Sequence, residues 1–278
     1  SNDAGTGTLD SASNNTGLGH QAFNNLTSGD DNTAMGTNSM FANTTGSDNT
    51  GVGLSSLNAN TTGDNNTAVG SGALAANTTA NANIAIGSDA LNDNTTGALN
   101  VAVGTYALDT NTTAERNTAI GYAAMDANTE GQYNTAVGAN ALDANTTASY
   151  NTTVGYRSLG ANTTGSENTA IGADAGLSIT TGSYNVAMGY RALDTNTTGD
   201  YNVALGRRAL DSNTTASNNV AIGRSSMESN TTGTNNVAVG STSLDANTEG
   251  DQNVAIGRDV LSANTTGQDN VGVGYASL

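Results

Sequence analysis

Acidic side chains recur along this chain at intervals of seventeen residues, a spacing that could align them for metal binding. Asp109, Asp126 and Asp143 follow one another at this interval. Further carboxylates occupy the equivalent place later in the chain, at Asp194, Asp211, Glu228 and Asp245. A column of oxygen ligands can hold Ca²⁺, although neither an EF-hand loop nor a glycine-rich nonapeptide calcium pattern is present. We therefore expect a solvated acidic stripe, with calcium along Asp109, Asp126 and Asp143 as the alternative.

Arginine and tyrosine form a second set of candidate residues, at two adjacent places of the same interval. Such a patch could bind acidic glycans or a partner protein. The arginines could instead neutralise the acidic stripe, and we favour this second interpretation. The residues are Arg157, Arg191, Arg207, Arg208, Arg224, Arg258, Tyr156 and Tyr190.

Eleven Asn-Thr-Thr triplets match the acceptor pattern for N-glycosylation. The same residues suit a tight polar turn, which is the interpretation that we favour. Rows of threonine could also order water on a flat face, and this is the chemical basis for ice binding as an alternative. The candidate acceptors are Asn43, Asn60, Asn77, Asn94, Asn111, Asn145, Asn162, Asn196, Asn213, Asn230 and Asn264.

Residues for enzymatic chemistry do not stand out from this background. The chain has one histidine, His20, and no cysteine. Gly-x-Gly patterns such as residues 51–53 do not open a helix, so they are not phosphate loops. We expect no catalytic, cofactor-binding or metal-binding residue and no enzymatic activity.

One repeating unit places all of these residues. It reads NTAIGYAAMDANTEGQY at Asn117–Tyr133, and fifteen full copies start at Asn15 and at every seventeenth residue after it. A sixteenth copy begins at Asn270 and stops at Leu278. A fixed short period without insertions is typical of a solenoid. We predict a degenerate N-terminal coil or cap at residues 1–14 and a continuous solenoid at residues 15–278.

The pattern inside the unit predicts an all-β fold, a β-solenoid or β-roll of about sixteen coils. Numbered from its Asn, the unit has a small residue at position 3, an aliphatic residue at position 4, Gly at position 5 and Leu at position 9. We predict strands at positions 2 to 4 and 7 to 9, with Gly at a backbone of positive φ. The Asn of position 1 should form an internal ladder between stacked coils. Examples of these two structural columns are Asn117, Asn134, Asn151, Asn168, Gly121, Gly138, Gly155 and Gly172.

The composition limits the classes of partner. The formal net charge is −17, and all seven cationic residues are Arg. This balance disfavours nucleic acids and anionic membranes. No apolar run approaches the roughly 20 residues of a membrane-spanning helix.

The strands Asn-Thr-Ala-Ile-Gly and Asn-Val-Ala-Ile-Gly, followed by Ala-Leu and a polar turn, resemble the head repeats of YadA-like trimeric autotransporter adhesins. Similar repeats occur in bacteriophage tail fibres. The resemblance covers Asn15 to Leu278, but this unit has seventeen residues where the family's usual unit has fourteen. It implies a trimeric β-roll that lies outside the cell, on the cell surface or in a virion fibre, as a stalk or adhesive head.

The core of one coil offers two large apolar side chains, at positions 4 and 9, against the ordering cost of seventeen residues. We therefore expect association, with a side-by-side trimer first and an end-to-end filament second. The small residues of position 3, such as Ala119, Ala136 and Ala170, should then lie at the contact between chains. The predicted function is structural, as the shaft of an extracellular fibre, adhesin or filament. The alternative is a binding protein for ice, or for a host surface or its glycans, through the repeat face.

Overall fold

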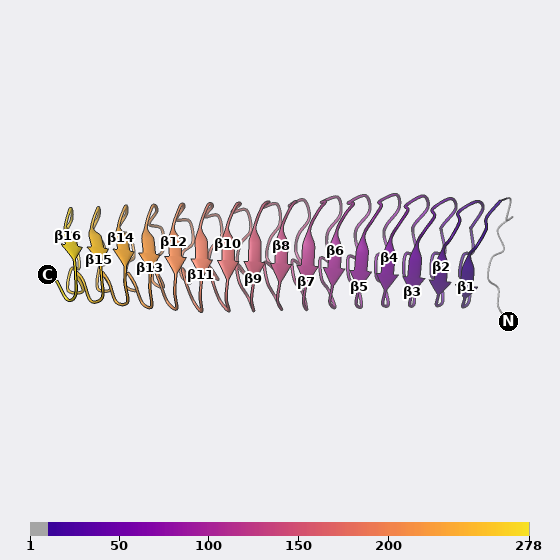
Figure 1. The fold of residues 1–278 in the computed structure, drawn as a ribbon. Coiled ribbons are helices and arrows are strands. Elements are labelled where there is room, and N and C mark those ends of the chain that lie inside the picture. The colour runs from indigo at the N-terminus through magenta and orange to yellow at the C-terminus, as the bar shows by residue number, and fades with distance from the viewer. Residues whose placement is uncertain (1–10, 278) are drawn as a thin grey trace. The chain divides into compact units, whose positions relative to one another are not determined.

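The computed structural model describes residues 11–277 and is a parallel β-solenoid built from seventeen-residue coils (Figure 1). The predicted fold class is confirmed. The chain divides between Ala139 and Asn140 into two units, the N-terminal unit and the C-terminal unit. The coil or cap predicted at residues 1–14 falls largely on residues outside the described range and stays a prediction.

Each coil contributes one strand of three residues, at repeat positions 2 to 4. The strands of the N-terminal unit are β1 (Thr16–Leu18), β2 (Thr33–Met35), β3 (Thr50–Val52), β4 (Thr67–Val69), β5 (Ile84–Ile86), β6 (Val101–Val103), β7 (Thr118–Ile120) and β8 (Thr135–Val137). Those of the C-terminal unit are β9 (Thr152–Val154), β10 (Thr169–Ile171), β11 (Val186–Met188), β12 (Val203–Leu205), β13 (Val220–Ile222), β14 (Val237–Val239), β15 (Val254–Ile256) and β16 (Val271–Val273).

Within each unit, consecutive strands pair in parallel and in strict repeat register. Thr118 lies beside Thr135, and Thr169 lies beside Val186, both seventeen residues along the chain. Main-chain hydrogen bonds continue beyond the strands, as from the Gly121 amide to the Val103 carbonyl at 2.8 Å. Equal repeat positions therefore form columns along the stacking direction.

The glycine of position 5 ends each strand for two physical reasons. Its φ lies between +125° and +143° in all sixteen copies, a region that side chains with a Cβ avoid. A Cβ on Gly121 would also lie 2.5 Å from the carbonyl oxygen of Gly138 in the next coil. The predicted positive φ is confirmed.

The second strand predicted at positions 7 to 9 is wrong. These residues lie in turns, and positions 7 and 9 both adopt a left-handed backbone, with φ of +54° at Arg191 and +55° at Leu193. Their main-chain groups still bond to the neighbouring coils, as from Leu193 N to Ala209 O at 2.9 Å. The chain therefore turns sharply here and carries Leu into the interior without forming a pleated strand.

The interior of the coil holds the small residue of position 3 and the large residue of position 9. Ala119, Ala136 and Ala170 are fully buried, as are Leu142 and Leu193. Position 3 faces positions 8 and 9: a Cβ on Gly51 would lie 2.8 Å from the Ser39 hydroxyl oxygen and 3.2 Å from the Met40 methyl carbon. Position 4 points outward instead.

Two sequence predictions are therefore corrected. The large residue of position 4 does not belong to the core, because alternation along a strand sends it to the side opposite position 3. The small residues of position 3 do not lie at a contact between chains. They leave room for Leu across a narrow interior, so a leucine in place of Ala136 would overpack the coil itself.

Two ladders of buried asparagine hold the coils together. At position 1, the side-chain oxygen of Asn151 accepts from the Asn168 amide at 2.9 Å, and its Nδ2 donates to Gly165 O at 3.0 Å. The predicted ladder is confirmed. A second ladder, which the sequence did not reveal to us, runs at position 12, where Asn60 Nδ2 donates to Asn43 Oδ1 and to Gly63 O, both at 3.0 Å.

The coil from Asn168 to Tyr184 exchanges the usual core residues of two positions. Gly176 stands where Leu is usual, and Ile179 stands where the second ladder has Asn. The Ile179 side chain is fully buried and fills the space: its Cδ1 lies 3.1 Å from the place of a Cβ on Gly176. The exchange interrupts the ladder, since the buried Oδ1 of Asn162 has no hydrogen-bond partner among the described residues.

We predict that these two exchanged residues are strongly coupled. Gly176→Leu alone should destabilise by about 1–3 kcal/mol through overpacking against Ile179. Ile179→Asn alone should cost about 2 kcal/mol or more, because it empties the space above Leu159. The double variant re-forms the leucine column and gives Asn162 Oδ1 a donor, so it should be at least as stable as the parent.

Urea denaturation of the four proteins in the double-mutant cycle measures this coupling. Leu177→Ala, a half-buried change in the same coil, is the control that should leave the coupling unchanged. Additive effects of the two substitutions would contradict the exchange.

Candidate functional site: the outer face of the sheet

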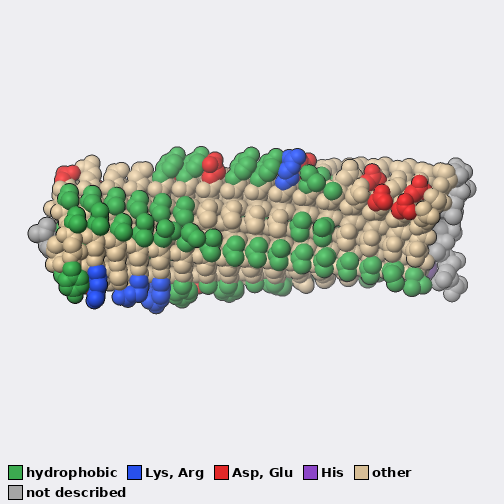
Figure 2. Space-filling model, viewed as in Figure 1, with side chains coloured by type: hydrophobic (Ala, Val, Ile, Leu, Met, Phe, Trp, Pro, Cys, Tyr) green, Lys and Arg blue, Asp and Glu red, His purple; other side chains and the backbone are tan. Residues whose placement is uncertain are grey.

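The outer face of the sheet is formed by repeat positions 2 and 4, which point away from the interior. The position 4 side chains are large, apolar and solvent-exposed, with 40% exposure at Ile86 and 39% at Met188. Figure 2 shows this face as continuous rows of apolar side chains over the strands. Exposed apolar surface that extends over many coils is typical of an interaction site.

The two units differ in the column of position 2. The N-terminal unit has mostly threonine here, with Ile84 and Val101 as exceptions, whereas β11 to β16 of the C-terminal unit have valine throughout. The second apolar row of Figure 2 belongs to these valines. Within residues 11–277 the hydroxyls of Thr33, Thr50 and Thr67 have no hydrogen-bond partner, and these three side chains are half-buried.

Side chains of positions 17 and 6 border the outer face on its two sides. At position 17, the rings of Tyr184 and Tyr201 stack in parallel with centroids 4.8 Å apart. At position 6, Tyr190 lies beneath the guanidinium of Arg207, 6.0 Å from the ring centroid. The face is therefore apolar in the middle, and its two edges are polar and aromatic.

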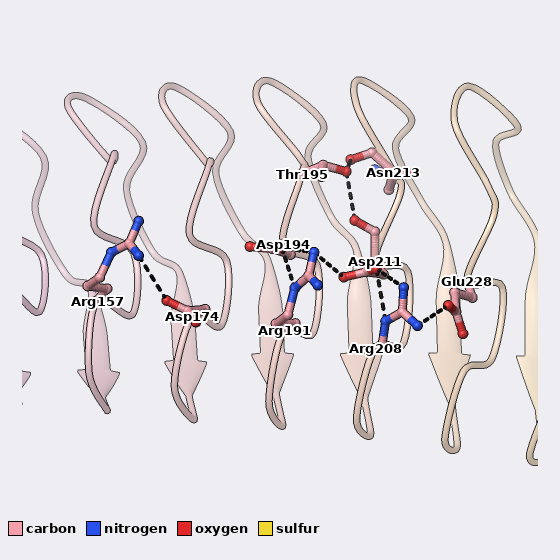
Figure 3. Close-up of polar contacts among 9 residues, drawn as sticks. All are labelled: Arg157, Asp174, Arg191, Asp194, Thr195, Arg208, Asp211, Asn213 and Glu228. Atoms are coloured by element: carbon pink, nitrogen blue, oxygen red, sulfur yellow. Dashed lines mark hydrogen bonds and ion pairs between the residues drawn. The ribbon is translucent and has the colours of Figure 1, made fainter.

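The predicted arginine and tyrosine patch divides into two groups with different surroundings. The position 7 arginines Arg191 and Arg208 turn toward the acidic column of position 10, as Figure 3 shows. Arg191 Nη2 lies 2.7 Å from Asp194 Oδ2, and Arg208 bridges Asp211 at 2.9 Å and Glu228 at 2.7 Å. Arg157 lies 3.8 Å from Asp174.

The position 6 group remains directed at solvent beside the outer face. Arg207, Arg224 and Arg258 are exposed. Arg258 contacts Asp259 at 3.1 Å and the ring of Tyr275 at 5.6 Å, and Arg157 lies over the ring of Tyr156 at 5.8 Å. Charge neutralisation thus accounts for the arginines of position 7. The arginine and tyrosine side chains of position 6 are the ones that could contact a partner.

Burial within the acidic stripe raises the pKa of three of its members. Burial first, and then the charges of Asp126, Asp93 and Asp89, raise the pKa of Asp109 to about 6. Burial also raises the pKa of Asp143 and of Asp245. In residues 11–277 no group of three or more His, Cys, Asp or Glu side chains is placed to hold a metal ion.

The Asn-Thr-Thr triplets are part of the stacking architecture. The Asn of position 12 is fully buried in all the predicted acceptors except Asn264, which is half-buried in the last complete coil. The Thr of position 13 is also engaged, as where Thr44 Oγ1 donates to Thr61 O at 2.9 Å. A glycan on Nδ2 would have to leave the ladder, so the geometry favours the turn interpretation.

The described residues contain one notable hollow, beside the exchanged coil of the C-terminal unit. It has a volume of about 510 Å³ and lies between Asp143 and Arg157, with Gly160, Leu177 and Thr180 on its walls. It is open to solvent. Gly160 stands at position 10, where the preceding coil carries Asp143.

Comparisons with known proteins leave the chain without an assigned relative. No protein family, no curated protein and no solved structure was found to match it. The described part of the chain contains no helix long and apolar enough to cross a bilayer.

We predict that Asp109 destabilises the solenoid at neutral pH. A carboxyl whose pKa rises on folding, here from 3.8 to about 6, contributes most below pH 3.8 and loses that contribution as the pH rises through 6. Asp109→Asn should therefore raise the stability at pH 7 by about 1 kcal/mol, a value reduced for solvent screening. The gain should vanish near pH 4.

Thermal unfolding of the parent and the variant at several pH values between 4 and 7 tests this. Glu130→Gln, which removes an exposed charge at position 14, is the matched control and should show no such pH dependence. An equal effect of Asp109→Asn at pH 4 and pH 7 would contradict the prediction.

Proposed function

We propose that this chain is a non-enzymatic structural protein that associates side by side with other copies, as a segment of an extracellular fibre or surface filament. One observation carries the proposal: the outer face of the sheet bears a column of large apolar side chains in each unit, many of them exposed, such as Ile86 and Met188. Leaving such a surface in water is unfavourable by about 25 cal/mol per Å². A partner that covers it would relieve this cost.

The strict repeat register supports a second copy as that partner. The columns of the face repeat at the strand spacing of about 4.8 Å. A partner that contacts every coil in the same way must carry groups at a matching spacing, and another copy of the chain has this property by construction. An ordinary globular protein would contact only a few of the repeats.

The location outside the cell rests on the resemblance of the repeat to YadA-like head repeats and phage fibre repeats. The strongly acidic composition is compatible with a solvated, secreted segment. The sequence suggested a trimer with its contact at position 3, but the residues of position 3 lie inside the coil. The outer face of positions 2 and 4 takes its place as the proposed contact.

The proposal predicts that charge on the outer face dissociates the assembly without unfolding the coils. Met188→Asp combined with Ile222→Asp places carboxylates in the middle of the face, where burial against a partner would cost more than 1.4 kcal/mol, or tenfold in affinity. Sedimentation equilibrium should show association of the parent and at least tenfold weaker association of the variant. Far-ultraviolet circular dichroism should remain unchanged.

Thr198→Asp is the matched control, because it adds charge at an exposed site away from the outer face. It should sediment like the parent. Sedimentation at about 100 µM detects any association tighter than roughly millimolar. A parent chain that stays monomeric at this concentration would overturn the proposed function.

Ice binding is a second candidate, and a specific observation favours it. In the N-terminal unit the position 2 threonines alternate with apolar position 4 side chains across a regular face, and the hydroxyls of Thr33, Thr50 and Thr67 have no hydrogen-bond partner within residues 11–277. Thermal hysteresis that is abolished by Thr50→Lys with Thr67→Lys, and retained by Thr113→Lys at position 14, would support it. Absence of hysteresis in the folded parent would exclude ice binding. A glycan array tests the remaining alternative, glycan binding at the position 6 arginines.

A further inference from the structure

The two edges of the outer face in the C-terminal unit carry opposite charge. Arg207, Arg224 and Arg258 are exposed along the position 6 edge. The opposite edge carries Glu167 and Asp269 at position 17, and Asp200 and Asp251 lie at position 16, one residue further from the middle of the face. Because all strands run in parallel, every coil is directed from the acidic edge toward the basic edge.

The charged groups of these edges keep capacity for an external partner. Arg207 contacts the Tyr190 ring. Neither Arg207 nor Arg224 forms an ion pair with another described residue. Asp200 accepts from the Ser183 amide through Oδ1 alone, at 2.7 Å, and Asp251 accepts from Thr234 through Oδ1 alone. A carboxylate has about four acceptor sites, so each can also accept from a guanidinium.

We propose that the outer face of the C-terminal unit binds the same face of a second copy, with the two chains parallel and in register. The proposal rests on the proposed function and specifies its geometry. The two copies would be related by a two-fold axis that runs along the stacking direction, over the middle of the face. This symmetry reverses the strand direction across the interface, so the basic edge of one copy lies over the acidic edge of the other.

The register follows from the sequence of each coil. In this arrangement Arg207 lies opposite Asp200 of the second copy, because both belong to the level of β12. At the level of β15, Arg258 lies opposite Asp251 in the same way. Arg224 lies opposite the polar Ser217 and Asn218, so no like charges meet at its level.

The aromatic residues follow the same rule as the charges. At the level of β11, Tyr190 of one copy lies opposite Tyr184 of the other, and aromatic pairs across an interface are favourable beyond their buried area. At the level of β16, the Tyr275 hydroxyl lies opposite the carboxylate of Asp269, a suitable acceptor. Chemically matched side chains thus meet within single coils.

The antiparallel alternative places like charge on like charge. A two-fold axis along the strand direction would set Arg207, Arg224 and Arg258 over the same basic edge of the second copy. Like charges brought together at an interface repel and disfavour that arrangement. Edge charge therefore selects the parallel orientation, and the apolar columns of positions 2 and 4 supply the attraction.

The size of the face suits a specific interface. The six residue steps from position 17 to position 6 span about 20 Å, and eight strands span about 38 Å, which gives roughly 750 Å² per copy. Specific protein interfaces bury about 800 Å² on each partner. The apolar centre and charged rim also match the usual anatomy of such interfaces.

Cysteine cross-linking tests both orientation and register, because the parent chain has no cysteine. Arg207→Cys and Asp200→Cys would be made as separate full-length variants and treated with a short bis-maleimide. The expected result is a covalent dimer in the mixture of the two variants and none in either variant alone. Arg207→Cys mixed with Asp251→Cys, three coils out of register, is the matched control and should give no product.

Tyr201→Cys, at the exposed neighbouring position, replaces Asp200→Cys if loss of the Ser183 contact disturbs folding, which circular dichroism would report. Cross-linking of Arg207→Cys with itself would reveal the antiparallel orientation and overturn the proposal. So would sedimentation of the parent as a trimer, or product in the out-of-register mixture. A monomeric parent would instead overturn the proposed function, so the two failures are distinguishable.

Discussion

A buried amide that depends on the next coil for its hydrogen bonds is the constraint on which this structure rests. A position 1 asparagine accepts through Oδ1 from the following coil and donates through Nδ2 to a carbonyl of its own coil, as Asn117 does toward Asn134 and Gly131. Buried polar groups that lose such partners cost about 1–3 kcal/mol each. An insertion or deletion would displace a whole column at once, which explains why the period of seventeen is unbroken from Asn15 onward.

The narrow interior follows from the same stacking. Polar ladders occupy two corners of each coil, and the remaining space admits one large side chain, from position 9, against a small one, from position 3. The coil with Gly176 and Ile179 shows that the volume matters more than the position that supplies it. The substitution of an isoleucine for a ladder asparagine leaves Asn162 Oδ1 unsatisfied, so packing was retained there at the expense of a hydrogen bond.

The partners of the arginine side chains depend on how far their column lies from the outer face. Arg191 and Arg208 of position 7 lie against the carboxylates of position 10 and form a ladder of ion pairs. Arg207 and Arg224 of position 6 lie one residue closer to the face and form no ion pair within residues 11–277. A shift of one residue thus separates a group that stabilises the coil from a group that can recognise a partner.

The sequence by itself determined the period, the solenoid, the position 1 ladder and the positive φ of Gly121 and its equivalents, because these depend on local chemistry repeated in every copy. Only the tertiary structure decided which side of the strand faces inward. Alternation along the strand places positions 2 and 4 on one side and position 3 on the other, but either side could be the interior. The left-handed turn that carries Leu193 inward decides which side is the interior. The position 12 ladder depended on the fold in the same way, although one signal was present. The two replacements of its asparagine, Leu26 and Ile179, are both aliphatic, as expected for a side chain that is buried whatever its polarity.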